Sequence, residues 1–232
     1  MAARVKSKRR YESPRRRAQA AETRRQMLEG AQRLFEERGY AATTMAAIAV
    51  EADVALKTVY VAFESKSGVL RALWNLLLRG DESEAPVAER AWYRKVLDEP
   101  DPRRQLRLAA RASRAVKERV GAVLGVIRSA ATVDAEIAAL WSRIQTEFYA
   151  NQGAIVESLQ KKKALRPGLD VARATDILWT LNHPDVWLLL IGERGWTPEQ
   201  WERWFGDTIC EQLLRDPDRG RQATRKGRAR RG

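Results

Sequence analysis

The chain has 232 residues, enough to bury a hydrophobic core without disulfides or structural metals. One cysteine and one histidine exclude a disulfide framework, a cysteine-rich zinc module and a multi-histidine metal site. The longest uncharged stretch, Gly39–Val50, has 12 residues, whereas a membrane-spanning helix needs about 20. We therefore expect a soluble protein of a reducing, cytoplasmic compartment, without a cofactor, a bound metal or a membrane partner.

The net charge of +13 is concentrated at the two ends of the chain. Residues 1–17 carry +7 and residues 215–232 carry +6, so the body between them is neutral. Neither end has apolar residues at helical spacing, and we expect both to be disordered basic tails. Such tails attract polyanions, because each neutralised phosphate releases a counter-ion. A tail that only improves solubility has the same composition, so the charge alone does not decide between the two.

Apolar residues in the body recur at intervals of three and four, the period of an α-helix. The eight prolines all fall between these periodic segments. We expect residues 81–101 to form a loop with one helical turn around Trp92. Asp170 and Thr197 are predicted N-caps, the latter within a capping box that Gln200 completes. The predicted helices span 15–38, 45–52, 56–62, 66–80, 102–117, 119–130, 133–163, 171–181, 184–194 and 198–214.

The segment Thr43–Lys66 has the pattern of two short helices joined by a three-residue turn. Thr44 can cap the first helix, and Val59 and Phe63 form the inward side of the second. This arrangement is typical of a helix-turn-helix, in which the second helix enters the major groove of DNA. An ordinary pair of surface helices has a similar pattern, so the spacing leaves both interpretations open.

The outward side of the second helix offers groups that suit DNA. Hydroxyl and ammonium groups contact phosphate oxygens, whereas a lysine can instead reach guanine and a valine can pack on a thymine methyl. We assign the guanine or phosphate contact to Lys57 and the methyl contact to Val61. The full set of candidate DNA-binding residues is Thr44, Lys57, Thr58, Tyr60, Val61 and Lys66.

This segment resembles the DNA-binding head of the tetracycline-repressor (TetR) family of bacterial transcriptional regulators. The sequence departs from the family pattern at three positions. Asp53 replaces the usual glycine of the turn, Ala55 replaces the usual serine cap of the second helix, and Ala47 replaces a residue that is commonly acidic. Aspartate tolerates the left-handed conformation, whereas the alanine should weaken the cap by about 1 kcal/mol. The matching residues are Ala31, Phe35, Gly39-Tyr40, Thr43-Thr44, Ile48-Ala49, Ala52, Val54, Thr58-Val59-Tyr60, Phe63 and Ser65-Lys66.

The resemblance implies an all-α protein with a three-helix head over 18–66 and a helical regulatory and dimerisation domain over 67–214. It implies a sequence-specific regulator, expected to be a homodimeric repressor, that a small-molecule effector releases from double-stranded DNA. Two recognition helices per dimer would require a pseudo-palindromic operator. The effector itself stays unknown, because no charged constellation in the sequence singles out a ligand class.

The family's dimer interface implies that the last two long helices pack against a second copy. These are 171–181, either alone or together with 184–194, and 198–214. Tryptophans gather in this part of the chain, and aromatic residues are enriched in interface cores. A monomer core also uses tryptophan, so both locations stay open. The candidate interface residues are Leu178, Trp187, Trp201, Trp204, Phe205 and Ile209.

An effector pocket inside the body would be lined by apolar residues of several helices. Most of the candidates are expected to be ordinary core residues, and a minority to touch a ligand. They are Trp74, Leu78, Leu108, Ile127, Trp141, Ile144, Gln145, Phe148 and Trp179.

Two other functions compete with this interpretation. An enzyme is disfavoured, because the sequence contains no nucleophile elbow, phosphate-binding glycine loop or metal-ligand cluster. His183 is expected to cap a helix and Cys210 to be a buried apolar residue. The second competitor is a non-specific nucleic-acid binder or chaperone-like protein that acts through its tails.

Overall fold

The computed structural model describes residues 14–79 and 86–215. Within these ranges every regular element is a helix, apart from an isolated bridge between Leu165 and Leu214. The predicted all-α class is therefore confirmed. The helices are α1 (Pro14–Ala42), α2 (Met45–Glu51), α3 (Leu56–Phe63), α4 (Lys66–Arg79), η1 (Val87–Glu89), α5 (Ala91–Asp98), α6 (Pro102–Ala130), α7 (Ala135–Lys161), α8 (Val171–Leu181), α9 (Pro184–Leu188), the π-helical η2 (Leu189–Glu193) and α10 (Pro198–Leu213).

The described part of the chain extends slightly into both predicted basic tails. α1 begins at Pro14, one residue before the predicted helix 15–38, so the last four residues of the predicted tail 1–17 are helical. Proline is favoured at the first helical position and arginine is a strong helix former, which explains the earlier start. At the other end, Arg215 donates its backbone N–H to the carbonyl oxygen of Ala164 at 3.0 Å. The remainder of each predicted tail lies outside the described residues.

The chain divides into two compact units, Met1–Leu73 and Trp74–Gly232, with the division inside α4. In the first unit α2 packs against both α1 and α3. α1 contains one non-helical residue, Gly39, with φ 75° and ψ 175°. Glycine adopts this conformation readily, whereas residues with a side chain rarely do. The buried hydroxyl of Thr43 donates to the carbonyl oxygens of Leu34 at 3.1 Å and Gly39 at 2.8 Å. The kink is thereby fixed, and the chain is directed into α2.

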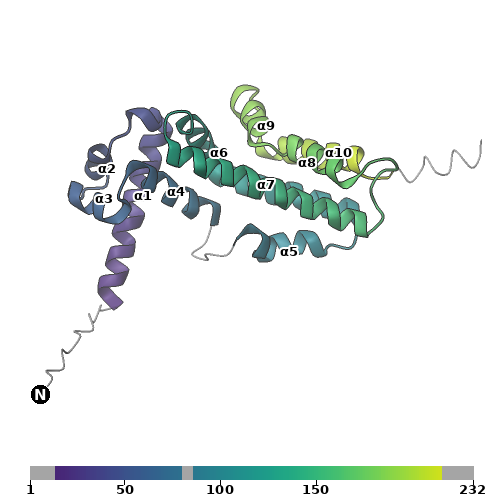
Figure 1. Ribbon diagram of the computed structural model, residues 1–232, viewed down its shortest axis with the longest axis horizontal. Helices are drawn as coiled ribbons and strands as arrows, with labels where there is room; N and C mark the ends of the chain where they lie inside the picture. Colours follow the sequence, from purple (N-terminus) through teal and green to yellow (C-terminus); the bar gives the residue numbers. More distant parts are fainter. Residues whose placement is uncertain (1–13, 80–85, 216–232) are drawn as a thin grey trace, which may run out of the picture. The chain divides into compact units, whose positions relative to one another are not determined.

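In the second unit, α6 packs against α7 and α10, and α8 packs against α7 and α10 (Figure 1). α6 is one continuous helix, whereas the sequence predicted two helices with a break at residue 118. The predicted break has no proline or glycine beside it, and Lys117 there is buried instead of exposed. α5 has two turns where one was predicted, because Tyr93 and Val96 bury their side chains in the core of this unit.

The predicted dimer-interface residues lie mainly inside a single chain. Trp201 and Phe205 are 0% exposed, and their rings stack with centroids 4.8 Å apart. Trp187 meets Trp201 edge-to-face at 5.1 Å, and Leu178 and Ile209 are also 0% exposed. Because these side chains have almost no free surface, the prediction that they contact a second copy is wrong. Trp204 is the one member of the predicted set that keeps partial exposure.

Several helix ends match the sequence predictions. The carboxylate of Asp170 accepts from the backbone N–H of Arg173 at 2.8 Å. Thr197 and Gln200 form the predicted capping box at the start of α10. His183 is the N-cap of α9, where its Nδ1 accepts from the N–H of Asp185. Cys210 is buried, as predicted.

None of the helices in the described ranges combines the length and apolar character needed to cross a membrane.

Candidate nucleic-acid interface and internal cavity

The turn between α2 and α3 is fixed by local backbone geometry. Thr44 caps α2, its hydroxyl accepting from the N–H of Ala47 at 3.1 Å. Asp53 adopts φ 51°, the left-handed conformation that aspartate tolerates, so it replaces a turn glycine without disrupting the turn. The N–H of Val54 donates to the carbonyl oxygen of Ala49 at 3.0 Å. These contacts hold α2 and α3 in the order and spacing of a helix-turn-helix.

The inner side of α3 packs into the core of the first unit. Val59 is 0% exposed and Phe63 is 4% exposed, and Ile48 of α2 and Phe35 of α1 are fully buried. The guanidinium of Arg24 lies 4.2 Å from the centre of the Phe63 ring and donates to the carbonyl oxygen of Ala62 at 2.6 Å. A positive group at the C-terminal end of α3 also complements the helix dipole. α3 is therefore held on its buried side and at its last turn.

The outer side of α3 faces solvent as the sequence predicted. Lys57 and Thr58 are exposed, Tyr60 is 48% exposed and Val61 is 76% exposed. Thr44 is exposed beside the start of α2. Two apolar residues that the sequence analysis passed over, Val50 and Leu56, are also exposed here. The structure thus presents hydroxyl, ammonium and apolar groups together on the outer surface of α2 and α3.

Lys66 is placed differently from the other candidates. Its ammonium donates to the carbonyl oxygen of Tyr40 at 2.7 Å and lies 4.2 Å from the centre of the Tyr40 ring. The side chain is half-buried rather than extended into solvent. Lys66 therefore ties the start of α4 to the end of α1, and only its remaining N–H groups are available to a phosphate.

The connection from α3 to α4 is a tight turn at Glu64. Glu64 has φ 65° and ψ −45°, and the N–H of Ser65 donates to the carbonyl oxygen of Phe63 at 2.7 Å. This is a γ-turn with positive φ, a strained conformation for a residue with a side chain. A Cβ at Gly68 would lie 2.0 Å from the Phe63 carbonyl oxygen, so the turn also requires a glycine there.

The second unit contains a cavity of about 120 Å³ surrounded by α4, α5, α6, α7 and the α8–α9 junction. Five of the predicted pocket residues line it, namely Trp74, Leu78, Ile144, Gln145 and Phe148. Four others do not, namely Leu108, Ile127, Trp141 and Trp179.

The four residues outside the cavity are occupied elsewhere in the second unit. Leu108 packs against the hydrophobic core, and Ile127 is fully buried. Trp179 meets His183 edge-to-face with centroids 4.9 Å apart, while Trp141 is half-buried on α7. Helical periodicity gave the buried side of each helix, but it could not separate cavity wall from close-packed core.

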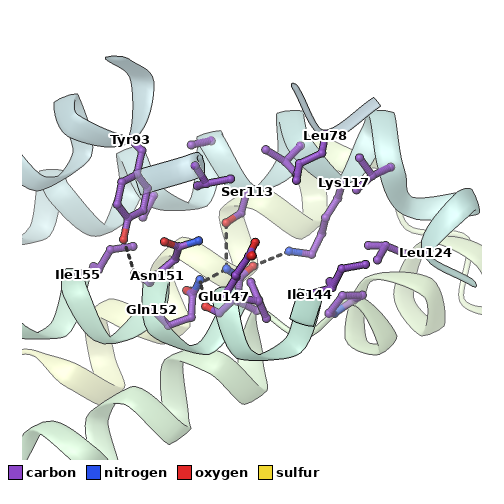
Figure 2. A pocket seen from close by; sticks show the side chains of 18 of the residues that line it. Leu78, Tyr93, Ser113, Lys117, Leu124, Ile144, Glu147, Asn151, Gln152 and Ile155 are labelled. Atoms are coloured by element: carbon purple, nitrogen blue, oxygen red, sulfur yellow. Dashed lines mark hydrogen bonds between the residues drawn. The ribbon is translucent and has the colours of Figure 1, made fainter. Parts of the chain in front are cut away.

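A buried polar network lines one side of the cavity, and the sequence analysis missed it (Figure 2). Lys117 donates to Oδ1 of Asn182 at 2.5 Å. The amide of Asn182 donates to Oγ of Ser113 at 3.0 Å and to Oε1 of Gln152 at 3.1 Å. Burial lowers the pKa of the Lys117 ammonium from 10.5 to about 7. The signal was present in the sequence, because Lys117 falls on the apolar stripe of α6 between Ala110 and Val120.

The aromatic end of the cavity is formed by α5, for which the sequence predicted a loop with one helical turn around Trp92. Tyr93 lines the cavity, and its hydroxyl donates to the carbonyl oxygen of Asn151. Burial raises the pKa of the Tyr93 hydroxyl. Trp92 of the same helix also lines the cavity.

Comparisons with known proteins agree with this geometry. Residues 27–73 match a family described as bacterial regulatory proteins, tetR family. The chain is similar to the HTH-type transcriptional regulator TtgR of Pseudomonas putida, with 38% identity over 86 residues. This match covers 34% of the chain and 41% of TtgR, so less than half of that relative's length is matched.

The fold is similar to those of several solved structures. The structure of a SmeT–triclosan complex matches with a TM-score of 0.67 and 16% identity, covering 84% of this chain and 93% of that one. NalD, the secondary repressor of the MexAB-OprM multidrug efflux pump in Pseudomonas aeruginosa, matches with a TM-score of 0.64 and 22% identity. That match covers 85% of this chain and 99% of NalD.

Proposed function

We propose that this chain, which matches the tetR family of bacterial regulatory proteins over residues 27–73, is a homodimeric transcriptional regulator of that family that binds a pseudo-palindromic DNA operator. It acts as a repressor on DNA in the bacterial cytoplasm and leaves the operator when a small-molecule effector occupies the cavity of the second unit. The observation that carries this proposal is the outer side of α3, which is exposed while Val59 and Phe63 anchor the helix from behind.

α3 supplies the base contacts in this proposal. Val61, 76% exposed, packs on a thymine methyl, and the exposed ammonium of Lys57 donates to guanine O6 or N7. The hydroxyls of Thr44, Thr58 and Tyr60 contact phosphate oxygens and position the helix. The segment 18–66 holds six basic and seven acidic residues, so its affinity depends on such directed contacts and on the basic ends of the chain.

The dimer forms through the outer surfaces of α8 and α10 in this proposal. A shallow surface groove between these helices is lined by Ile177 and Leu181, which are partly exposed, and by polar residues such as Arg173 and Asp176. A dimer with its two-fold axis at this surface carries two copies of α3. If the two copies are about 34–36 Å apart, they fit into successive major grooves of the operator.

The effector acts through α4. Trp74 and Leu78 line the cavity, and they share α4 with Lys66, which is tied to Tyr40 at the other end of the helix. An effector that prefers one position of α4 shifts the population of head spacings toward that position. DNA affinity falls when the preferred spacing no longer matches the operator.

Selection of bound sites from a random double-stranded DNA pool, with the full-length chain, tests this proposal. The expected result is a consensus with two-fold symmetry. Val61→Glu places a carboxylate on α3 and should abolish enrichment of that consensus. Val133→Glu is the matched control, since Val133 is 74% exposed at the α6–α7 turn and the substitution is identical. A pool without a symmetric consensus, or equal enrichment by the two variants, contradicts the proposal.

Shortened chains separate this function from non-specific binding through the basic ends. Because α1 begins at Pro14, the deletions should remove residues 1–13 and 216–232 and leave the helices intact. A sequence-specific regulator keeps its consensus but loses affinity and part of its salt dependence. Loss of all DNA binding together with the two ends would favour the non-specific binder.

Sedimentation of the full-length chain tests the dimer. We expect a dimer at micromolar concentration, and we expect Ile177→Glu to shift it toward monomer because a carboxylate is introduced into the α8–α10 surface. Ala139→Glu on the exposed side of α7 serves as the control. A wild-type chain that stays monomeric contradicts the dimer proposal.

A further inference from the structure

The cavity of the second unit has the size and the walls of a site for a small apolar molecule. Its volume is about 120 Å³, and for comparison a cavity of about 150 Å³ lined by aliphatic and aromatic residues binds benzene. Most of its lining is apolar, including the aromatic rings of Trp74, Trp92 and Phe148. The size and the lining are therefore in the range that suits a single small ring or a short branched chain.

One cationic side chain interrupts this apolar lining. Lys117 of α6 is 5% exposed, and its Nζ lies 4.8 Å from the centre of the Trp201 ring and 5.9 Å from that of Phe148. In Figure 2 the Lys117 side chain extends from α6 and ends at a dashed line, which marks its hydrogen bond to Asn182. Aromatic faces and an amide oxygen favour an ammonium at this position, but they carry no full negative charge.

The side chains of the polar network around Lys117 are neutral, so none of them acts as a counter-ion for its ammonium. The Asn182 amide donates to Ser113 and Gln152, which directs its oxygen toward the lysine. Among the described residues, no carboxylate forms an ion pair with Lys117, and burial is the cause of its lowered pKa. An ammonium has three N–H donors, so two remain after the bond to Asn182.

A second donor in the cavity is also unsatisfied. Nε2 of Gln145 is buried and has no hydrogen-bond partner within the described part of the chain. Oε1 of the same side chain faces Nε2 of His183 at 3.3 Å. Lys117 and Gln145 both line the cavity, so it offers unsatisfied donors from two helices to whatever occupies it.

We propose that the effector is a small apolar molecule with one anionic group, such as a monocyclic carboxylate, and that Lys117 is its counter-ion. This inference rests on the proposed function, because it names the class of effector for the same cavity. The anion accepts from the free N–H groups of Lys117, and the apolar body fills the space between the aromatic rings.

The charge of Lys117 favours an anionic ligand over a neutral or a cationic one. A buried ammonium is costly unless an opposite charge and hydrogen bonds satisfy it, and an anionic ligand supplies both. A neutral ligand leaves this cost in place, and a cationic ligand adds repulsion. Glu147 also lines the cavity, but its side chain is exposed, so its charge is screened by solvent.

The ion pair makes binding depend on pH in a defined direction. Lys117 must be protonated in the complex, and the free cavity holds the pKa of this lysine near 7. Affinity should therefore fall by about tenfold per pH unit above pH 7, until the raised pKa of the complex is reached. Binding at pH 8 should take up close to one proton per ligand, and binding at pH 6 should take up almost none.

Other charged groups lie on the elements packed around Lys117. They are Glu147 of α7, Asp185 and His183 of the α8–α9 junction, Glu202 of α10 and, on α6 itself, Arg114 and Glu118. Burial lowers the pKa of His183 below its ordinary 6.5, so it is neutral above pH 7.

Isothermal titration calorimetry of the full-length chain with benzoate, benzamide and benzylamine tests this proposal. These probes share one ring and differ in charge. At pH 6.5 benzoate should bind at least about tenfold more tightly than benzamide, and benzylamine should bind most weakly. Titrations in two buffers of different ionisation enthalpy give the number of protons taken up at pH 8. Benzamide equal to benzoate, or benzoate binding without proton uptake at pH 8, overturns the proposal.

Two lysine variants assign the effect to the cavity. Lys117→Met keeps the length and apolar stem of the side chain, and it should abolish both the preference for benzoate and its pH dependence. Lys95→Met on the exposed side of α5 removes the same charge outside the cavity and should change neither. Identical benzoate binding by the two variants would assign it to general attraction by a basic chain and overturn the proposal.

The outcome is independent of the DNA-binding proposal. Calorimetry measures the probes without DNA, and site selection measures DNA without the probes. A symmetric consensus without benzoate preference leaves the regulator in place and removes the anionic effector. Benzoate binding by a chain that enriches no DNA sequence does the reverse.

Discussion

The ammonium of Lys66 donates to the carbonyl oxygen of Tyr40 at 2.7 Å and stands 4.2 Å from the centre of the same residue's ring. One side chain thus satisfies a carbonyl at the end of α1 and makes a cation–π contact. Both contacts lie within the first unit, where they join the first turn of α4 to the end of α1.

Lys66→Met should lower the stability of the first unit by about 1–2 kcal/mol, because one hydrogen bond and one cation–π contact are lost. Thermal or denaturant unfolding measures this change. Arg71→Met, an exposed charge removal on the same helix, should have little effect. If Lys66 were instead mainly a phosphate contact, its loss would reduce the slope of log K against log salt by about 1 and leave stability unchanged.

Lys57→Ala should relax base preference at one position of each half-site, because a lysine bonded to guanine contributes about 1–3 kcal/mol of discrimination. Site selection with the variant, compared with wild type, measures the preference. Lys95→Ala removes an equally exposed lysine on α5 and should preserve the consensus. Uniformly weaker binding with the same consensus would assign Lys57 to a phosphate.

Ala55→Ser should stabilise α3 by about 1 kcal/mol, because Ala55 is the N-cap and provides no side-chain hydrogen bond. Its extended backbone, with φ −65° and ψ 140°, suits a capping serine. Amide hydrogen exchange over Leu56–Phe63 should slow by about fivefold. Thr44→Ala deletes the cap of α2 and should accelerate exchange there, so the two substitutions are expected to act in opposite directions.

The stability of variants at Glu64 should depend on the backbone strain of the γ-turn rather than on the charge of the side chain. With φ 65°, Glu64→Gly relieves a conformation that L-residues disfavour and should raise stability by up to about 1 kcal/mol. Glu64→Ala should be close to wild type, and Glu64→Val less stable because it is β-branched. Denaturant unfolding gives this order. A valine variant as stable as the glycine variant would show that the turn is unstrained.

Lys117→Met should raise the free energy of unfolding, most at pH 7 and below and less as the pH rises toward 10.5, because burial disfavours the protonated lysine that the unfolded chain keeps. The pKa of Lys117 is lowered from 10.5 to about 7 by burial. Between these values the unfolded state binds more protons, so wild-type stability rises with pH by up to about 1.4 kcal/mol per unit.

Denaturant unfolding at pH 7, 8.5 and 10 should show the two proteins converging as the pH increases. A difference between them that does not depend on pH would mean that Lys117 stays protonated in the folded chain.

Local sequence signals predicted much of the fold and the outer side of α3. The inward positions of Val59 and Phe63 and the exposed positions of Tyr60 and Val61 follow from helical periodicity. The caps at Asp170 and Thr197 follow from short-range hydrogen bonding, which depends on three or four neighbouring residues. Asp53 adopts the turn conformation that its chemistry permits.

The cavity could be predicted only in part. Gln145 and Phe148 were identified, but Leu108 and Trp179 fall on the same kind of apolar stripe and pack elsewhere. A helix-period pattern says which side of a helix avoids water. It does not say where neighbouring helices leave space, because that depends on how side chains from several helices fit together.

By itself, the sequence determined an all-α chain with a helix-turn-helix near its N-terminus, because periodicity and capping are properties of adjacent residues. Only the tertiary structure decided that Trp201 and Phe205 are buried within one chain and that Lys117 meets Asn182, 65 positions away, beside a cavity. Burial by the same chain and burial by a second copy need the same apolar residues, so composition cannot separate them. The environment of a charge is likewise set by residues distant in sequence, which the folded chain alone brings together.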